Sequence, residues 1–159
     1  MMSFISAVER NHGVLDMKKK MMVSIVVVAA VIFIGLQLLP FGKELSNPPV
    51  VREPDWDSAA TRELAQAACF DCHSNGTNWP WYRKVAPVSW LLEYDVTTGR
   101  SFFNFSEWED GRILADEFAF VINNNSMPPI QYRIIHPEAR LSADQKQALI
   151  QGLERSLGE

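Results

Sequence analysis

The sequence predicts an all-α protein in which about four helices form one domain, preceded by a single transmembrane helix. Three observations favour this fold class. Apolar residues in the second half recur at spacings of three and four, capping patterns precede two of these runs, and no segment alternates as strands do. With 159 residues, the chain is long enough for one such domain and an appendage.

The appendage is the stretch from Met21 to Phe41, in which only Ser24 and Gln37 are polar. About 20 apolar residues can cross the hydrocarbon core of a bilayer as a helix. A secretory signal has a shorter apolar region, about 7–15 residues, followed by a small-residue cleavage site, and no good site follows here. We therefore expect an uncleaved anchor, with a cleaved signal as the alternative. No cysteine lies near the end of the run, which argues against a lipoprotein.

Three lysines, at positions 18–20, flank the apolar run on its N-terminal side. Because basic flanks stay in the cytoplasm, these lysines predict a cytoplasmic N-terminus and an exported C-terminal domain. We expect a single-pass protein of the bacterial inner membrane with its domain in the periplasm. Met17 also resembles a translation start, so residues 1–16 are either an over-extended gene start or a cytoplasmic tail.

A proline-containing segment separates the anchor from the domain. Pro48, Pro49 and Pro54 oppose helix and favour extended, semi-rigid chain, which would hold the domain close to the membrane surface. We therefore divide the chain into a short cytoplasmic segment (1–20), the anchor (21–41), the linker (42–54) and the domain (55–159).

Two helices are predicted in the first half of the domain. The first runs from Asp57 to about Phe70, with Asp57 or Ser58 as its N-cap residue. The second begins near Pro87, which suits a first helical turn, and stops at Gly99, which suits the left-handed position after a helix end. The inner side of the first helix is expected to carry Leu64, Ala67 and Ala68.

Two more helices are predicted in the second half, each opened by a capping box. The third starts at Ser106, where residues 106–109 form the box, and runs to about Ile122. The last starts with the box at residues 142–145. The expected apolar positions are Leu114, Phe118, Val121 and Ile122 in the third helix, and Leu149, Leu153 and Leu157 in the last.

The motif at residues 69–73, Cys-Phe-Asp-Cys-His, has the C-x-x-C-H spacing of c-type haem attachment. On a helix, Cys69, Cys72 and His73 leave on one face. Two thiols can then bond the two vinyl groups of one porphyrin while the imidazole reaches the iron as proximal ligand. The motif predicts one covalent haem c per chain. A thiol oxidoreductase is the alternative, although the βαβ context of thioredoxin is missing, and a zinc site built with His136 would be awkward.

A six-coordinate iron needs a second axial ligand, and the sequence offers two. Met127 is the only methionine after position 22, and two prolines that stiffen the chain follow it, which suits a ligand presented from a loop. Its alternative role is core filler. His136, followed by Pro137, is the other candidate and would give bis-histidine ligation with a lower reduction potential. We expect Met127 to be the ligand and His136 to be a hydrogen-bonded loop histidine.

A buried haem also needs supporting groups. The carbonyl of Pro80 or Pro87 is expected to accept a hydrogen bond from the second nitrogen of His73. The basic candidates for pairing with the propionates are Arg83, Lys84 and Arg100, each equally consistent with an exposed charge. The aromatic residues expected to form the core and pocket are Trp79, Trp81, Tyr82, Trp90, Tyr94, Phe102, Phe103, Phe105, Trp108, Phe118, Phe120 and Tyr132.

Several further short motifs follow the C-x-x-C-H motif along the chain. They are SNGTNWPWY at residues 74–82, APVSW at 86–90, GR at 99–100, NFSEW at 104–108, MPP at 127–129 and HP at 136–137.

In this order the motifs resemble the bacterial haem-binding domain family of small monohaem c-type cytochromes, over residues 55–157. The resemblance implies a cytochrome c-like α-helical fold around one haem, with its first and last helices packed together. It also implies covalent attachment to Cys69 and Cys72, and iron ligation by His73 and Met127.

The function expected from these features is single-electron transfer by a membrane-tethered carrier, not an enzyme. Its partners would be unidentified redox proteins of the respiratory or periplasmic chain. A haem peroxidase or gas sensor with a labile distal ligand is the alternative within haem chemistry. The whole chain has a net charge of −4, and the part after Gly42, with 11 basic and 17 acidic residues, carries about −6. An acidic domain gives no support for nucleic-acid binding.

Overall fold

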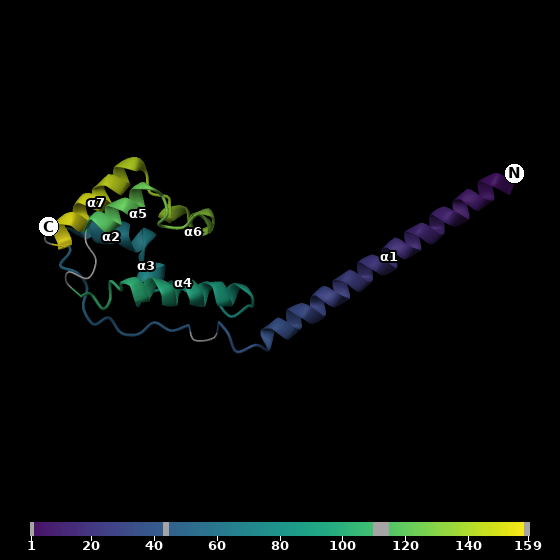
Figure 1. Ribbon diagram of the computed structural model, residues 1–159, viewed down its shortest axis with the longest axis horizontal. Coiled ribbons are helices and arrows are strands. Elements are labelled where there is room, and N and C mark those ends of the chain that lie inside the picture. Colours follow the sequence, from purple (N-terminus) through teal and green to yellow (C-terminus); the bar gives the residue numbers. More distant parts are fainter. Residues whose placement is uncertain (1, 43–44, 110–114, 158–159) are drawn as a thin grey trace.

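A computed structural model describes residues 2–42, 45–109 and 115–157. In these ranges the chain forms seven α-helices, one 3-10 turn and no strand, apart from an isolated bridge between Arg52 and Glu107 (Figure 1). The predicted all-α class is confirmed. The helices are α1 (Met2–Gln37), α2 (Ala59–Ala68), α3 (Phe70–His73), α4 (Val88–Phe102), α5 (Ala115–Asn123), α6 (Ile130–Ile135) and α7 (Ala143–Leu157), with the 3-10 turn at Pro137–Ala139.

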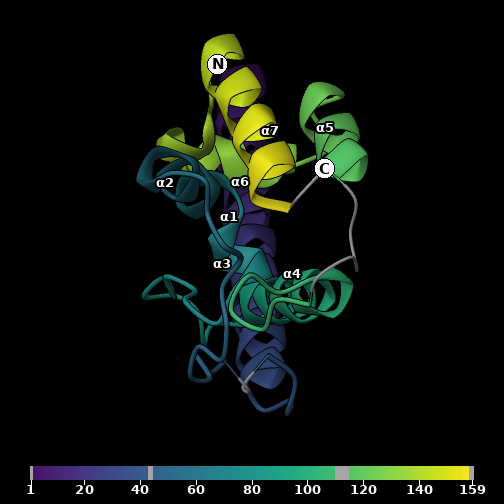
Figure 2. The same ribbon diagram turned by 90° about the vertical axis from the view of Figure 1, so that its left-hand side faces the viewer.

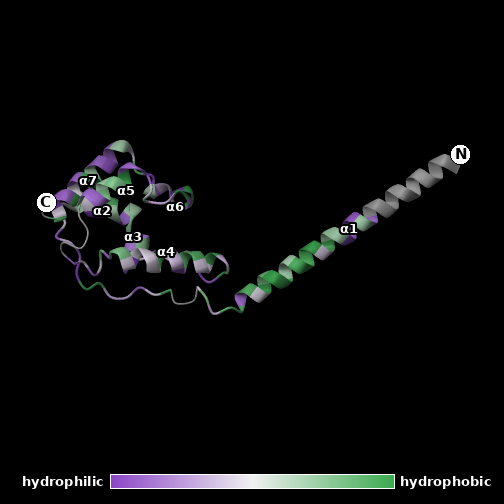
Figure 3. Ribbon diagram, viewed as in Figure 1, coloured by the Kyte–Doolittle hydropathy of each residue, from purple (hydrophilic) through white to green (hydrophobic). Residues whose placement is uncertain are grey.

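Helix α1 extends away from the packed part of the chain, and its half nearest to the domain is strongly apolar (Figure 3). Its segment Asp16–Gln37 has 22 residues, a mean hydropathy of 2.2 and nothing buried inside the protein. This helix is therefore long and apolar enough to cross a membrane, as either an anchor or a signal sequence.

Both predicted caps of the domain's first and last helices are confirmed. Ser58 caps α2 by accepting a hydrogen bond from the Thr61 N–H at 3.2 Å. At α7, the Gln145 N–H donates to the Ser142 hydroxyl at 3.2 Å, and the Ser142 N–H donates to the Gln145 side chain at 2.8 Å. The two helices cross at Gly152, where any Cβ would clash with Thr61, so the expected packing of first against last helix is present.

The first predicted helix is interrupted at Cys69, where the backbone leaves helical geometry with φ of −127°. Cys69 caps α2 through its N–H, which donates to the Ala65 carbonyl at 2.8 Å. Its own carbonyl then accepts from the His73 N–H at 2.9 Å and begins α3. The C-x-x-C-H motif therefore has a helical turn of its own, between α2 and α4.

The second helix continues three residues beyond the predicted stop at Gly99. Pro87 is its N-cap residue, as expected near a helix start. Gly99 lies inside α4 at the point where this helix approaches Cys72 of α3, and a Cβ there would clash with the Cys72 carbonyl. The glycine thus serves close packing rather than helix termination.

The predicted start of the third helix at Ser106 is wrong. The Ser106 hydroxyl accepts a hydrogen bond from the Asn75 N–H at 3.0 Å, so it caps no helix, and the Glu107 carboxylate accepts from the Asn75 side chain at 2.9 Å. Tertiary partners have displaced the local capping box. The helix α5 begins at Ala115 instead. Of the predicted apolar positions, Leu114 lies outside the described residues, while Phe118 and Ile122 are buried.

The proline-containing segment before α2 runs along the domain (Figure 2). The Val51 N–H donates to the Ser106 carbonyl at 2.8 Å, and the Trp108 N–H donates to the Arg52 carbonyl at 3.0 Å. Glu53 accepts two hydrogen bonds of 2.7 Å from the Arg62 guanidinium of α2. These bonds fix residues 51–53 to the domain surface.

The core is aromatic, but not every predicted ring takes part in it. Trp81 is 90% exposed and Phe120 is 68% exposed, so both predictions of core or pocket placement are wrong. Trp56 and Phe70 lie in or against the core although they were outside the predicted set. The buried cluster consists of Ala65, Phe70, Phe105, Trp108, Phe118, Ile122, Leu149, Ile150 and Leu153.

Candidate functional site

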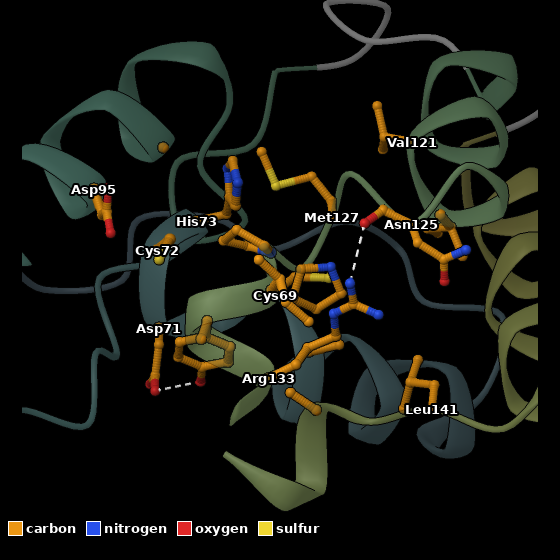
Figure 4. A pocket seen from close by; sticks show the side chains of 18 of the residues that line it. Cys69, Asp71, Cys72, His73, Asp95, Val121, Asn125, Met127, Arg133 and Leu141 are labelled. Atoms are coloured by element: carbon orange, nitrogen blue, oxygen red, sulfur yellow. Dashed lines mark hydrogen bonds between the residues drawn. The ribbon is translucent and has the colours of Figure 1, made fainter. Parts of the chain in front are cut away.

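A cavity of about 940 Å³ lies between α3 and α4 on one side and α5, α6 and the loop before α6 on the other (Figure 4). This volume is near the upper end of the range of about 300–1,000 Å³ that is typical of small-molecule and cofactor sites. Its wall is mostly apolar. The wall includes Cys69, Cys72, His73, Tyr94, Phe102, Phe103, Phe118, Val121, Ile122, Met127, Ile130, Tyr132, Arg133, Ile134 and Leu149.

The two thiols of the motif are free and belong to this wall. Burial raises the pKa of Cys69 to about 12, and burial together with the negative charge of Asp95 raises the pKa of Cys72 to about 12. Because a thiolate is the nucleophile in disulfide exchange, both groups are far from the low pKa of redox-active cysteines. The folded site therefore disfavours thiol–disulfide chemistry.

His73 is almost fully buried and has a fixed orientation. Its ring stacks on Phe103 at 4.1 Å between centroids, and its Nδ1 lies 3.4 Å from the Phe103 carbonyl oxygen. The predicted partners, the carbonyls of Pro80 and Pro87, are wrong: the segment after α4 supplies this oxygen. A proton on Nδ1 would leave Nε2 free to bind a metal. Burial lowers the pKa of His73, which favours the neutral imidazole that a metal requires.

Met127 is in the cavity wall, whereas His136 is not. The Met127 N–H donates to the Val121 carbonyl at 3.1 Å, and its side chain extends toward His73 (Figure 4). His136 stacks on Tyr132 at 4.0 Å and pairs with Glu138 at 2.9 Å. The two candidates for a second ligand thus differ in position, and only Met127 shares the cavity with His73.

A residue inside the motif also joins the two sides of the cavity. Asp71 of α3 accepts a 2.7 Å hydrogen bond from the Tyr132 hydroxyl of α6, and its other carboxylate oxygen accepts from the Asn78 N–H at 2.9 Å. Burial and the hydrogen bond to Asp71 raise the pKa of Tyr132. The spacing of the motif does not predict the contact between Asp71 and Tyr132, because the two residues lie 61 positions apart in the chain.

The comparisons with known proteins bear on what occupies this cavity. A family model described as a haem-binding domain matches residues 31–155. The chain belongs to the haem-binding domain family. No curated protein and no solved structure matches it.

The cavity of this haem-binding domain also suits the charged edge of a haem. Arg133 lines it, and its Nε is fully buried without a hydrogen-bond partner among the described residues. The same half-buried guanidinium donates a 3.3 Å bond to the Asn125 carbonyl (Figure 4). A buried guanidinium nitrogen without a partner is satisfied when a carboxylate, such as a haem propionate, lies beside it. The residues present therefore fit the group that the family implies.

The basic residues expected to pair with propionates do not line the cavity. Arg100 donates to the Ser74 carbonyl at 2.8 Å and to the Thr77 hydroxyl at 3.1 Å, so its charge holds the loop after the motif. Arg83 and Lys84 are also outside the wall. Across the described ranges, no three His, Cys, Asp or Glu side chains gather as metal ligands, which leaves the zinc alternative without support.

Proposed function

We propose that this haem-binding domain is a monohaem c-type cytochrome, anchored in the bacterial inner membrane, that transfers single electrons on the periplasmic side. One observation carries the proposal. A single helical turn presents Cys69, Cys72 and His73 to a largely apolar cavity, and the only methionine of the described domain, Met127, lies in the same wall.

In this proposal, Cys69 and Cys72 hold the haem through thioether bonds, His73 is the proximal ligand and Met127 is the distal ligand. When bound, haem c supplies an iron that alternates between Fe(II) and Fe(III). The protein contributes orientation and burial. Phe103 fixes the plane of His73 by stacking and its carbonyl holds Nδ1, while the apolar wall excludes water from the metal.

A carrier is favoured over a haem peroxidase or a gas sensor. Those functions need an iron position that a peroxide or gas can enter, and Met127 as a ligand would fill it. Peroxide cleavage also uses a distal acid–base group, and among the described cavity residues His73 is the one histidine. The thiol oxidoreductase alternative is disfavoured by the raised pKa values of both cysteines.

An uncleaved anchor is supported by contacts at the end of α1. The Gln37 side chain donates to the Ala86 carbonyl at 3.1 Å and accepts from the Ala86 N–H at 3.0 Å. The family match also begins at residue 31, within α1. A signal peptide that is removed has no reason to pair with the folded domain.

The test uses the full chain made in cells that carry haem-attachment machinery. We expect a low-spin spectrum, a one-electron redox couple and slow binding of carbon monoxide to the reduced protein. Met127→Leu should lower the potential and speed carbon monoxide binding at least tenfold, whereas His136→Leu should change neither. Fast carbon monoxide binding by the wild type would favour the gas-binding class, and a large effect of His136→Leu alone would reassign the distal ligand.

A further inference from the structure

The end of α1 is fixed to one particular edge of the domain. Besides the paired hydrogen bonds of Gln37 with Ala86, the Gly42 N–H donates to the Glu93 carboxylate of α4 at 2.6 Å. The Phe41 ring meets the edge of the Trp90 ring at 6.1 Å between centroids. The loop before α4 and the first turns of α4 therefore lie beside the C-terminal end of α1 (Figure 1).

The position of this edge relative to a bilayer follows from the length of the apolar helix. The apolar part of α1 begins after Lys20, so it covers residues 21–37 and has 17 residues. At about 1.5 Å per residue this part is about 25 Å long, and the mostly apolar residues 38–41 complete the thickness of about 30 Å of a hydrocarbon core. Gln37 then lies close to the outer boundary of the hydrocarbon. Because Ala86 is hydrogen-bonded to Gln37, the loop before α4 lies at the level of the lipid headgroups.

The exposed side chains of this edge are apolar and aromatic. Trp81 is 90% exposed and forms an edge-to-face pair with the half-buried Tyr82 at 5.4 Å between centroids. On α4, Val88 and Leu91 are exposed, whereas Ser89 and Val96 are buried. None of Trp81, Val88 and Leu91 lines the haem cavity, so a bound haem would leave these three exposed side chains uncovered. We call Trp81, Tyr82, Val88 and Leu91, with Arg83 and Lys84, the α1-proximal surface.

The charge of this surface differs from that of the rest of the domain. Arg83 and Lys84 follow Trp81 closely in the chain, and residues 79–92 contain no Asp or Glu, although the chain has a net charge of −4. Glu93, the next residue, is part-buried and accepts the hydrogen bond from the Gly42 N–H. Tryptophan and tyrosine are enriched at the membrane–water interface, and lysine and arginine near a surface are attracted to anionic headgroups. The composition therefore matches the interfacial layer of a membrane.

We propose that the α1-proximal surface inserts into the headgroup layer of the bilayer that α1 spans, with Trp81 as its principal anchor. The inference rests on the retained anchor of the proposed function. The domain is then attached to the membrane both by α1 and by the α1-proximal surface. These two attachments hold the domain at a fixed tilt, so the haem cavity has a defined orientation relative to the membrane. A membrane-bound or soluble redox partner would then always meet the same side of the domain.

The test places the full chain, with haem attached, in nanodiscs that contain anionic phospholipid and a phospholipid with a photoreactive group near its headgroup. After illumination, mass spectrometry locates the lipid adducts. We expect adducts on α1 and on residues 79–91. Trp81→Ser and the double variant Arg83→Glu, Lys84→Glu should each reduce the adducts on residues 79–91 at least threefold. Phe120→Ser, which changes a 68% exposed aromatic residue on α5, is the matched control and should have no effect.

The outcomes separate this inference from the proposed function. Adducts on α1 alone would overturn the membrane contact and leave the anchor standing. Adducts on neither segment, with the chain recovered in the aqueous fraction, would remove the anchor and the inference together. Unchanged adducts in Trp81→Ser and in the charge-reversed variant, each with an unaltered haem spectrum, would also overturn the proposal.

Discussion

The two sides of the cavity differ in how firmly they are held. On the His73 side, α3 is packed between α2 and α4, and a network of hydrogen bonds ties the loop after the motif to residues 104–107. On the Met127 side, α6 has no buried residue. Met127 itself is 44% exposed.

The Met127 side is held mainly by hydrogen bonds between surface groups. They include the bonds of Tyr132 with Asp71, of Arg140 with the Arg133 carbonyl, and of Lys146 with Asn125. The contrast indicates that His73 is preorganised, whereas the position of Met127 depends on bonds between surface groups. The following predictions test this difference.

The largest effect should follow from Gly99→Ala on the His73 side. The added Cβ would clash with the backbone carbonyl of Cys72, which a flexible side chain cannot relieve. We expect a loss of about 1–3 kcal/mol in the free energy of unfolding, measured by denaturant titration. The control is Gly76→Ala, where the nearest side-chain atom is 3.4 Å from the new Cβ. Equal stability of the two variants would contradict the tight packing of α3 against α4.

A smaller effect should follow from Tyr132→Phe on the Met127 side. The change removes the 2.7 Å hydrogen bond to Asp71, which joins the two walls, and should cost about 1 kcal/mol. Because α6 is then held less firmly, carbon monoxide should bind the reduced protein faster, as measured by flash photolysis. Tyr94→Phe, a change to another cavity tyrosine, is the comparison and should leave the rate unaltered.

The charge of Arg133 should set part of the reduction potential. A half-buried guanidinium beside the proposed haem edge would favour the reduced iron, so Arg133→Gln should lower the potential by about 30 mV, or about 0.7 kcal/mol for one electron. Potentiometric titration measures this shift. Arg83→Gln lies outside the cavity wall and should shift the potential far less. Equal shifts in the two variants would remove Arg133 from the haem edge.

The smallest effect concerns Glu53, which lies outside the cavity wall and accepts hydrogen bonds from Arg62 of α2. The hydrogen bonds from Arg62 lower the pKa of Glu53 below its ordinary value of 4.5. Its contribution to stability is therefore present above that value and is lost as the pH falls through the lowered pKa. Because the pair is partly exposed, Glu53→Gln should cost less than about 1 kcal/mol at pH 7 and nothing at pH 2. Unfolding curves at both pH values measure this difference.

The sequence could predict those features that depend on neighbours along the chain. The motif is local, so Cys69, Cys72 and His73 share one turn of helix, and the N-cap at Ser58 and the capping box at Ser142 act through neighbours along the chain. Ser106 has an equally good capping pattern but bonds to Asn75, 31 positions away. A distant partner of this kind cannot be read from spacing.

Residues with distant partners account for the other differences. The sequence suggested that Gly99 ends a helix, but the structure shows that a glycine is needed there because the backbone of Cys72 lies too close for a Cβ. Tyr132 was expected in the core or pocket, but its hydrogen bond to Asp71 and the place of Arg133 in the wall depend on α6 folding over the motif. The polar contacts of the site therefore come from the tertiary structure, while the C-x-x-C-H motif is visible in five consecutive residues.

The central claim is that Cys69 and Cys72 carry a covalently bound haem. The most direct measurement is the mass of the denatured full chain, purified from cells with haem-attachment machinery, together with its pyridine haemochrome spectrum. We predict a mass increase of one haem that survives denaturation, a c-type spectrum, and loss of both in the double variant Cys69→Ser, Cys72→Ser. A colourless chain of unmodified mass, with both thiols open to alkylation, would contradict the claim.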